Sequence, residues 1–398
     1  MKQETAIITY ARGGSSLSAI RSLGKKGIRI IAIDSDKYSP GFSSKYTHKA
    51  VLHKEKSQNL RAYRNALKKI FEKEHCLTIL PMDELSGYIL SKYKNEFEEK
   101  RNYKMPWPDF AQLKIAQDRK KLLNLAEDLG IPTPKHYTLN EIERGEIEGP
   151  WVIKPGYSMI ENGHIAVFGK VSYASRINDL KKIFNTMKNQ GLNPIIQEFI
   201  PGEGYGFFAL YNKGTLKASF QHRRLREASI TGGGGSLRES TRIPELQKEG
   251  LKIPQKLKWH GPLMVEFKKD QRDGSFKLME INPRFWGSLN LAIQSGVDFP
   301  YLFCQMAMTG DCESVLDYKV GIKCKNFDWE LLHLNSFFTS SNLSPGILKQ
   351  NFIKSLFSVI LSAFTVKDDY LSKNDLRPFA YELIYTGRAL LEKLTKII

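Results

Sequence analysis

Residues 263–284 read LMVEFKKDQRDGSFKLMEINPR, and this stretch decides how the rest of the chain is interpreted. Glu266 and Glu280 each stand between apolar residues, so strand alternation turns both carboxylates to one face. The polar, turn-rich residues 268–275 would join the two strands as a hairpin and bring the carboxylates close together. Two adjacent carboxylates repel each other unless a cation lies between them. The stretch therefore predicts a cation site on paired strands.

Two further residues extend this site. Asn282 and Arg284 follow Glu280 at intervals of two, so they belong to the same strand face. Asn282 adds a third oxygen, and such a set suits a magnesium ion that keeps waters and takes phosphate oxygens. Arg284 supplies a planar cation suited to a carboxylate or a transferring phosphoryl group. The open alternative is an ordinary hairpin whose two acids face solvent.

Two weaker features lie upstream. Lys154 ends an apolar run and precedes Pro155, so its ammonium emerges from a buried strand, either as a phosphate ligand or as a surface lysine. In residues 197–203, the backbone beside Phe199 and Ile200 suits a flat heterocycle such as adenine, and Glu203 suits a ribose hydroxyl.

The first 105 residues predict a small α/β domain. Residues 5–10 form an apolar β-type run, a Gly-Gly turn and a helical stretch follow, and residues 28–33 form a second apolar run. This β-α-β order, with a helix over 60–71 and a strand over 77–80, predicts a Rossmann-like parallel sheet.

Two prolines, Pro106 and Pro108, mark a boundary because they forbid helix and limit strand pairing. A helix is expected over 114–129, followed by short strands of an α+β body that include residues 151–154 and 195–198. The remainder is expected to be mostly helical. The expected domains are 1–105, 106–194, 195–310 and a helical C-terminal extension over 311–398.

Composition and charge restrict the environment and the partners. The four cysteines of this 398-residue chain lack CxxC spacing, and its first residues lack the features of a signal peptide, so a cytoplasmic location is expected. The net charge is +18, and residues 1–105 carry 21 Lys and Arg against 11 Asp and Glu. No RNP-like aromatic motif accompanies this charge, so no specific nucleic-acid partner is expected.

A possible membrane segment lies at residues 352–364. It is interrupted by Lys354 and is shorter than the roughly 20 apolar residues that a span requires. Its apolar residues repeat at helical spacing, which favours a helix packed into the core, with peripheral membrane contact as the alternative.

Two other patterns in the sequence point only weakly to a function. Gly13 and Gly14, with Asp34 about 20 residues later, imitate a dinucleotide-binding turn, but the GxGxxG spacing is incomplete. His222 and His260 lack a nucleophile motif and are expected to be polar turn residues.

Together, Lys154, residues 197–203, Glu266 and residues 280–284 resemble the ATP-grasp superfamily in order and spacing, over roughly residues 5–310. Members such as carbamoyl-phosphate synthetase, biotin carboxylase and D-alanine:D-alanine ligase share an N-terminal α/β domain and two subdomains that hold ATP between them. The chain looks most similar to the uncharacterised carboxylate-amine ligase branch. The motifs that carry this likeness are at 13–16, 81–84, 117–120 and 285–289.

The resemblance implies three groups of site residues. The nucleotide would contact Arg119, Lys154, Gln197, Glu198, Phe199, Ile200 and Glu203. Magnesium, or manganese, would be held by Glu266, Glu280 and Asn282. The transferred phosphoryl group and the acyl phosphate would be met by Arg284, Arg224 and Arg238. Two departures exist: Glu203 is offset by one from the usual ribose position, and the loop at 156–163 contains bulky residues.

The implied activity is an ATP-dependent carboxylate-amine ligase that forms an amide through an acyl phosphate. Its expected partners are ATP, a small-molecule or sugar-linked carboxylate and an amine, in cell-surface polysaccharide or amino-acid conjugate biosynthesis. The alternative is a non-catalytic nucleotide-sensing or polyanion-binding protein of the same fold.

Overall fold

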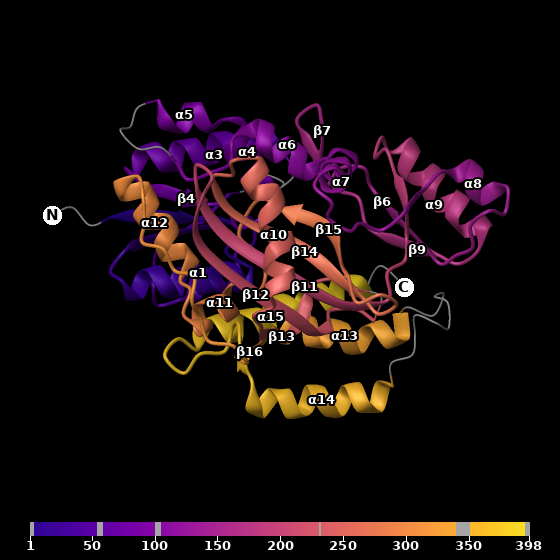
Figure 1. The fold of residues 1–398 in the computed structure, drawn as a ribbon. Helices are drawn as coiled ribbons and strands as arrows, with labels where there is room; N and C mark the ends of the chain where they lie inside the picture. The colour runs from indigo at the N-terminus through magenta and orange to yellow at the C-terminus, as the bar shows by residue number, and fades with distance from the viewer. Residues whose placement is uncertain (1–3, 54–58, 100–104, 231, 340–350, 395–398) are drawn as a thin grey trace.

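The computed structural model describes residues 4–53, 59–99, 105–230, 232–339 and 351–394 (Figure 1). An N-terminal α/β layer lies on one side of a broad, twisted sheet, and a small lobe with residues 139–154 and 172–189 projects at the opposite end (Figure 1). C-terminal helices run along the lower edge.

The N-terminal sheet has four parallel strands in the order β3-β2-β1-β4. These strands are β1 (Thr5–Ile8), β2 (Arg29–Asp34), β3 (Thr47–Leu52) and β4 (Thr78–Leu80). All four residues of β1 are buried, as expected for a strand covered on both faces. The parallel sheet predicted from the sequence is confirmed.

Five helices accompany this sheet. They are α1 (Gly14–Lys25), α2 (Pro40–Ser43), α3 (Leu60–Lys73), α4 (Glu84–Lys92) and α5 (Lys94–Glu98). The helix predicted over 60–71 is thus confirmed as α3. Asn59 caps it by accepting a hydrogen bond from the Ala62 backbone amide at 3.0 Å.

Two helices, not one, follow the proline boundary. The single helix expected over 114–129 is wrong: α6 (Phe110–Gln117) and α7 (Arg119–Asp128) meet at Asp118. Asp118 leaves the helical conformation, with φ −86° and ψ 101°, and its carboxylate caps α7 at the Lys121 amide at 3.1 Å. The Arg119 amide donates instead to the carbonyl of Gly156, 2.9 Å away.

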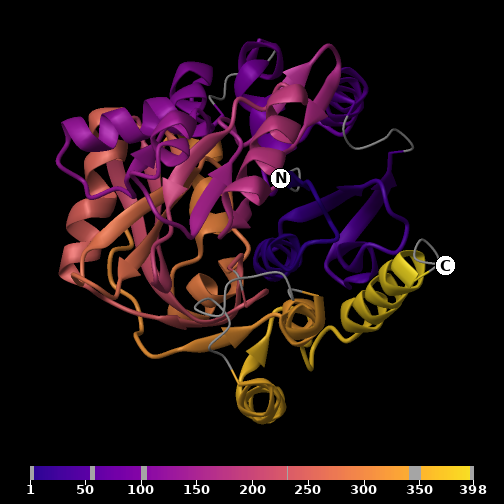
Figure 2. The ribbon, with the colours of Figure 1, turned by 90° about the vertical axis from the view of Figure 1, so that its right-hand side faces the viewer.

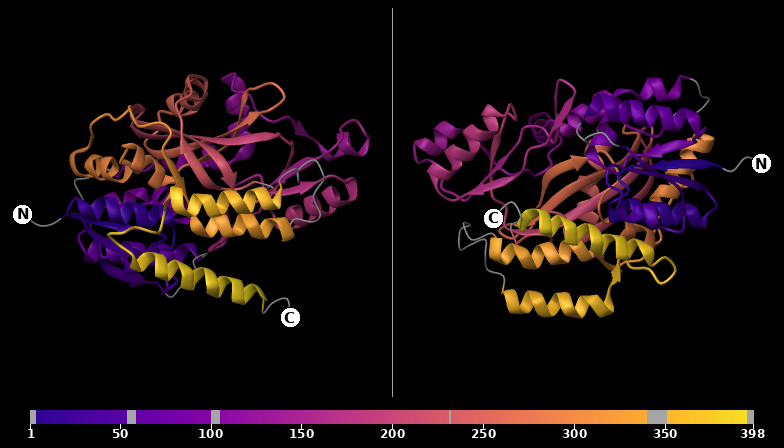
Figure 3. Two further views of the ribbon diagram at one scale, coloured as in Figure 1. Left: turned by 90° about the horizontal axis from the view of Figure 1, so that it is seen from below. Right: turned by 180° about the vertical axis from the view of Figure 1, so that it is seen from behind.

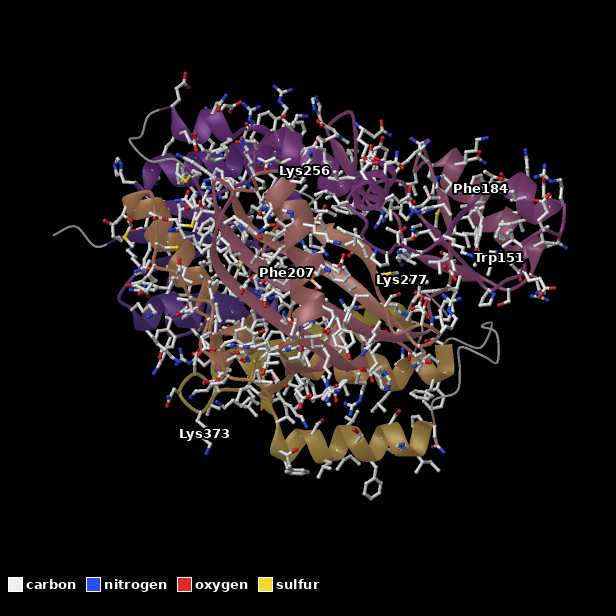
Figure 4. The ribbon with its side chains drawn as sticks, in the orientation of Figure 1. Trp151, Phe184, Phe207, Lys256, Lys277 and Lys373 are labelled. Carbon is white, nitrogen blue, oxygen red and sulfur yellow. The ribbon has the colours of Figure 1, made fainter. Side chains whose placement is uncertain are left out.

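The small lobe contains an antiparallel sheet in the order β5-β10-β6-β9. Its elements are β5 (His136–Tyr137), α8 (Leu139–Glu143), β6 (Trp151–Lys154), β9 (Ser172–Ala174), α9 (Ile177–Asn189) and β10 (Ile195–Glu198), and a separate hairpin joins β7 (Ile160–Asn162) to β8 (Ile165–Val167). Trp151 and Phe184 lie within this lobe (Figure 4).

Strand β10 bears on the proposed domain boundary at residue 195. Because β10 pairs with β5 and β6, it belongs to the small sheet. We therefore propose that the next subdomain begins after β10, with β11.

The central sheet has seven strands in the order β15-β14-β11-β12-β13-β16-β17. They are β11 (Gly202–Asn212), β12 (Thr215–Glu227), β13 (Gly235–Ser240), β14 (Gly261–Asp270), β15 (Phe276–Asn282), β16 (Lys323–Lys325) and β17 (Lys367–Asp368). Phe207 packs on one side with residues of α7 and of α10 (Pro244–Lys256), while Phe208 joins the N-terminal core with α11 (Leu289–Ser295) and α12 (Phe299–Thr309). Phe207 is labelled in Figure 4.

The C-terminal segment is mostly helical, as expected, with α13 (Phe327–Thr339), α14 (Phe352–Thr365) and α15 (Arg377–Leu394). It is also built into the rest of the fold. Its strands β16 and β17 extend the central sheet, and α15 lies beside α2 of the N-terminal layer (Figure 2). Arg21 of α1 binds Asp375 at 2.9 Å, which ties the two ends of the chain together.

The prediction that residues 352–364 pack into the core is wrong. Helix α14 turns its large apolar side chains outward, with Phe357 75% and Phe364 86% exposed. Its serine side faces the body, because Ser358 and Ser362 contact the ion pair between Arg226 and Glu330. Among the described residues, no helix is long and apolar enough to cross a membrane.

Candidate functional site

A cavity of about 470 Å³ lies between the small lobe and the central sheet. Its wall comes from strands β6, β9, β12, β14 and β15, a glycine-rich segment at 232–235, and Trp329 of α13. The lining residues of β14 are Met264, Glu266 and Lys268, which are spaced by two as alternation requires.

Glu266 and Glu280 are directly opposite each other on β14 and β15. Both line the cavity, and their side chains are 19% and 32% exposed. The predicted hairpin with its two facing carboxylates is therefore present. A β-bulge follows Glu266, between it and Phe267.

Each of the two carboxylates has a different cationic neighbour. Glu266 is bound by Arg224, which also contacts Glu227, with N–O distances of 2.6 and 3.4 Å. Burial and the nearby charge of Glu280 outweigh Arg224 and raise the pKa of Glu266 above its ordinary value. Burial also opposes ionisation of Glu280, but the charges of Arg119 and Lys154 prevail and lower its pKa.

Asn282 and Arg284 continue this face. The Asn282 amide donates to Glu280 at 3.1 Å, and its oxygen accepts from Arg284 at 3.0 Å. Arg284 also lies 3.5 Å from Glu84, at the first turn of α4. Glu84 accepts in turn from Ser158, so the N-terminal layer supports Arg284 without lining the cavity itself.

Lys154 lies at the end of β6 and is 6% exposed, with its side chain in the cavity wall. Burial and the charge of Arg119 lower its pKa to about 8, against the opposing effect of Glu280 and Glu266. A buried ammonium of this kind is stabilised by anions, and the two carboxylates supply part of that field.

Arg119 lies next to the cavity but is not among its lining residues. It donates to the carbonyl of Pro155 at 2.6 Å and approaches Glu280 at 3.3 Å. Arg119 thus bridges the turn after Lys154 to the acid pair.

The expected nucleotide residues divide into two sets. Phe199 and Ile200 line the cavity. Gln197, Glu198 and Glu203 do not line it. Gln197 is buried within β10, and Glu198 binds Arg272 at 2.6 Å. Glu203 is exposed and accepts from the Tyr205 hydroxyl at 3.2 Å, which agrees with its offset from the expected ribose position.

Arg238, unlike Arg224 and Arg284 of the same expected group, lies apart from the cavity. Its side chain is fully buried and does not line the cavity. Both oxygens of Asp369 accept from it at 2.8 Å, and the Gly235 carbonyl accepts at 3.0 Å. Arg238 therefore ties β13 to the C-terminal segment, and Asp369 neutralises its charge.

Several lining residues were missed from the sequence. Tyr173, Trp286 and Trp329 form aromatic parts of the wall, and the backbone of residues 232–235 forms another. A Cβ at Gly234 would lie 2.2 Å from the Trp329 ring, so only glycine fits there. The run of four glycines at 232–235 is the sequence feature that could have indicated this part of the wall.

The expectation that His222 is a turn residue is wrong. It lies within β12, is 2% exposed and lines the cavity. Burial and the charges of Arg224 and Arg238 keep its pKa well below its ordinary value, so the ring is neutral. His222 stands across β11 from Glu266, with Gly206 between them in the row.

The donor set of the acid pair fits a hard divalent cation. The described residues include no group of three or more histidine, cysteine or acidic side chains arranged to hold a metal. Two carboxylates with the amide oxygen of Asn282 nevertheless match the sparse protein ligation of magnesium, which keeps waters and takes phosphate oxygens. Arg224 would share Glu266 with such an ion.

The dinucleotide alternative receives no geometric support. The carboxylate of Asp34 is fully buried and is occupied by Arg12 and by the backbone amides of Ser35 and Asp36. It has no free edge for a ribose.

Comparisons with known proteins agree with this geometry. Residues 193–328 match the family model described as "ATP-grasp in the biosynthetic pathway with Ter operon". None of the curated proteins matches the chain.

Solved structures share the fold at low sequence identity. The biotin carboxylase domain of 2-oxoglutarate carboxylase from Hydrogenobacter thermophilus, in complex with MgADP, has a TM-score of 0.63 at 15% identity, over 81% of this chain and 74% of that one. N5-carboxyaminoimidazole synthetase from Staphylococcus aureus complexed with ADP has a TM-score of 0.59 at 16% identity, over 81% and 82%. The L-amino acid ligase from Bacillus licheniformis has a TM-score of 0.58 at 15% identity, over 78% and 75%.

Proposed function

We propose that this chain, which has the ATP-grasp fold, is an ATP-dependent ligase that joins a carboxylate to an amine. The observation that carries the proposal is one cavity lined by Glu266 and Glu280 in register and by the cations Lys154, Arg224 and Arg284. Facing acids and convergent cations suit a polyphosphate and its divalent ion.

The proposed reaction has two steps. A carboxylate oxygen of the substrate attacks the γ-phosphorus of ATP, the bond to the β-phosphate oxygen breaks, and ADP leaves. The amine nitrogen then attacks the acyl carbon, loses a proton, and expels inorganic phosphate to leave an amide. Both steps pass through concentrated negative charge, so fixed cations supply most of the catalysis.

Each residue receives a role from its position. Lys154, supported by Arg119, binds the phosphates, and Phe199 with Ile200 receives the adenine. Glu266, Glu280 and Asn282 would hold magnesium or manganese, which would neutralise the phosphate oxygens. Arg284 meets the transferred phosphoryl group or the substrate carboxylate, and Arg224 keeps Glu266 oriented.

The ligands and activities of structurally similar proteins support this choice. Two of these structures contain ADP, one as its magnesium salt, and a third is an amino-acid ligase. We propose a small-molecule or sugar-linked carboxylate as substrate, in the synthesis of a cell-surface polysaccharide or an amino-acid conjugate.

The test is ADP release in the presence of a panel of acids and amines. We expect Glu280→Gln to lower acid- and amine-dependent turnover at least about a hundredfold, because it removes half of the facing carboxylate pair. Glu239→Gln is the matched control, because Glu239 lies in the same sheet but binds Arg223 outside the cavity. Unchanged turnover in Glu280→Gln would contradict the assignment.

A nucleotide sensor of the same fold is the alternative. Calorimetry with MgADP separates the two functions when it accompanies the turnover panel. Tight nucleotide binding without ADP release from ATP across a broad panel would favour the sensor over the ligase.

A further inference from the structure

The outer face of α14 is an exposed apolar stripe. It consists of Ile353, Phe357, Ile360, Leu361 and Phe364, which are between 49% and 86% exposed. Their spacing of i, i+4, i+7, i+8 and i+11 places them on one side of the helix. A contiguous stripe of this size on a protein surface usually marks an interaction site.

The opposite side of α14 explains this orientation. Arg226 donates to the Ser358 hydroxyl, and Ser362 donates to Glu330 at 3.3 Å. The buried pair of Arg226 and Glu330 needs polar partners, and the serines supply them. The helix is therefore held with its apolar stripe facing away from the protein.

The helix is placed where a flat surface can reach it. It is the lowest element in Figure 1, and the end-on view in Figure 2 shows it clear of the other elements. Seen from below, it runs along the surface beside α13 (Figure 3). Phe352 packs on Phe337 and Phe338 of α13, whereas side chains on the outer side of α14 project away from the body (Figure 4). A plane can touch α14 along its whole length.

The exposed charged residues between 351 and 388 have one sign. Every acidic residue between 351 and 388 is buried, namely Asp368, Asp369, Asp375 and Glu382. The basic residues of the same stretch are exposed: Lys354, Lys367, Lys373, Arg377 and Arg388. Three of the four acids are taken by buried partners, as Asp369 is by Arg238. This segment thus presents apolar side chains with a cationic rim.

We propose that α14 lies in the interfacial layer of an anionic lipid bilayer. The outer face of α14 enters the boundary between headgroups and acyl chains, and Lys354, Lys367 and Lys373 lie near the lipid phosphates. Aromatic and aliphatic side chains on one face with lysines beside them are the features of a helix that lies in this layer.

A second copy of the chain fits the same stripe less well. In a twofold dimer the same patch meets itself, so the cationic rims would face each other and repel. An anionic surface attracts that rim, and the attraction weakens as salt screens it.

The experiment is sedimentation of the full-length chain with vesicles. Phosphatidylcholine vesicles containing phosphatidylserine should bind the protein, and vesicles of phosphatidylcholine alone should bind it less. We expect Phe357→Ser/Phe364→Ser to weaken binding to the anionic vesicles at least about tenfold, because two large apolar side chains no longer enter the lipid. We expect a triple variant, Lys354→Gln/Lys367→Gln/Lys373→Gln, to weaken binding to the anionic vesicles as well. This loss should be largest at low salt.

Ile165→Ser/Phe168→Ser is the matched control. Ile165 belongs to β8, in the hairpin at the top of Figure 1 on the side opposite α14, and Phe168 follows β8 directly. The two residues are 53% and 42% exposed. Binding by this control together with loss in the Phe357 variant supports the proposal. The proposal is overturned if the unaltered chain does not bind anionic vesicles at low salt. It is also overturned if the chain forms a dimer without lipid and the Phe357→Ser/Phe364→Ser variant is monomeric.

Discussion

Arg224 and Arg238 stand directly opposite each other on β12 and β13, yet their side chains serve different parts of the protein. Arg224 lines the cavity and binds Glu266, whereas Arg238 is sealed against Asp369. The resemblance placed both near the acyl phosphate, although Arg224 belongs to a basic stretch and Arg238 follows a run of glycines. The two arginines differ in their partners, and the partner of Arg238 lies 131 positions away along the chain.

This difference makes Arg238 a test of stability. Both partners have fully buried side chains, so Arg238→Ala leaves an uncompensated carboxylate at Asp369. We expect a loss of about 3–5 kcal/mol in the free energy of unfolding, measured with denaturant. The double variant Arg238→Met/Asp369→Leu should recover much of that loss. A stable Arg238→Ala protein that had lost only turnover would restore the catalytic role.

Lys154 gives nucleotide binding a pH dependence. Its pKa of about 8 means that the ammonium loses its proton as pH rises past that value, so MgADP affinity should fall between about pH 7 and about pH 9. Calorimetry over this range checks it. The Lys154→Met variant should bind MgADP more weakly at neutral pH, and its affinity should no longer fall over this pH range. The same fall in the variant would assign the pH dependence to another group.

The same shift has the opposite sign for stability without nucleotide. The unfolded chain holds the Lys154 proton up to about 10.5, while the folded chain releases it from about 8. Between these values the unfolded state binds more protons, so this residue makes the fold more stable as pH rises. Binding and stability therefore respond to Lys154 in opposite directions.

Helices and strands that depend on neighbouring residues could be predicted from the sequence. The β14–β15 hairpin was predicted because alternation fixes which face each side chain takes, and Glu266 and Glu280 do face each other. The Rossmann-like sheet was predicted from apolar runs separated by turn and helix signals. Asn282 at the end of β15, and Arg284 two residues beyond it, could be found in the same way.

Elements that depend on distant partners were not predicted. The apolar spacing of α14 is identical whether the stripe faces inward or outward, and the pair of Arg226 and Glu330 decides between the two. Strand β10 joined the small sheet through β5 and β6, which no local pattern reveals. Trp329 reaches the cavity from α13 only because residues 232–235 lack side chains that would block it.

The C-terminal segment, residues 311–398, holds the other parts of the molecule together. Three buried arginines of the preceding domains, Arg21, Arg226 and Arg238, take their carboxylate partners from residues beyond 311. Strands β16 and β17 also cover the β13 edge of the central sheet. The expected helical extension is thus a structural part of the domains that come before it.

We expect a chain that ends at residue 310 to be unable to adopt this fold. Each buried arginine left without its partner costs about 3–5 kcal/mol, and three of them together reach the entire stability of about 5–15 kcal/mol that a protein possesses. Near-ultraviolet circular dichroism and thermal unfolding, compared with the full-length chain, measure this. A truncated chain with the same spectrum and unfolding midpoint would show that the domains before residue 311 close without the segment.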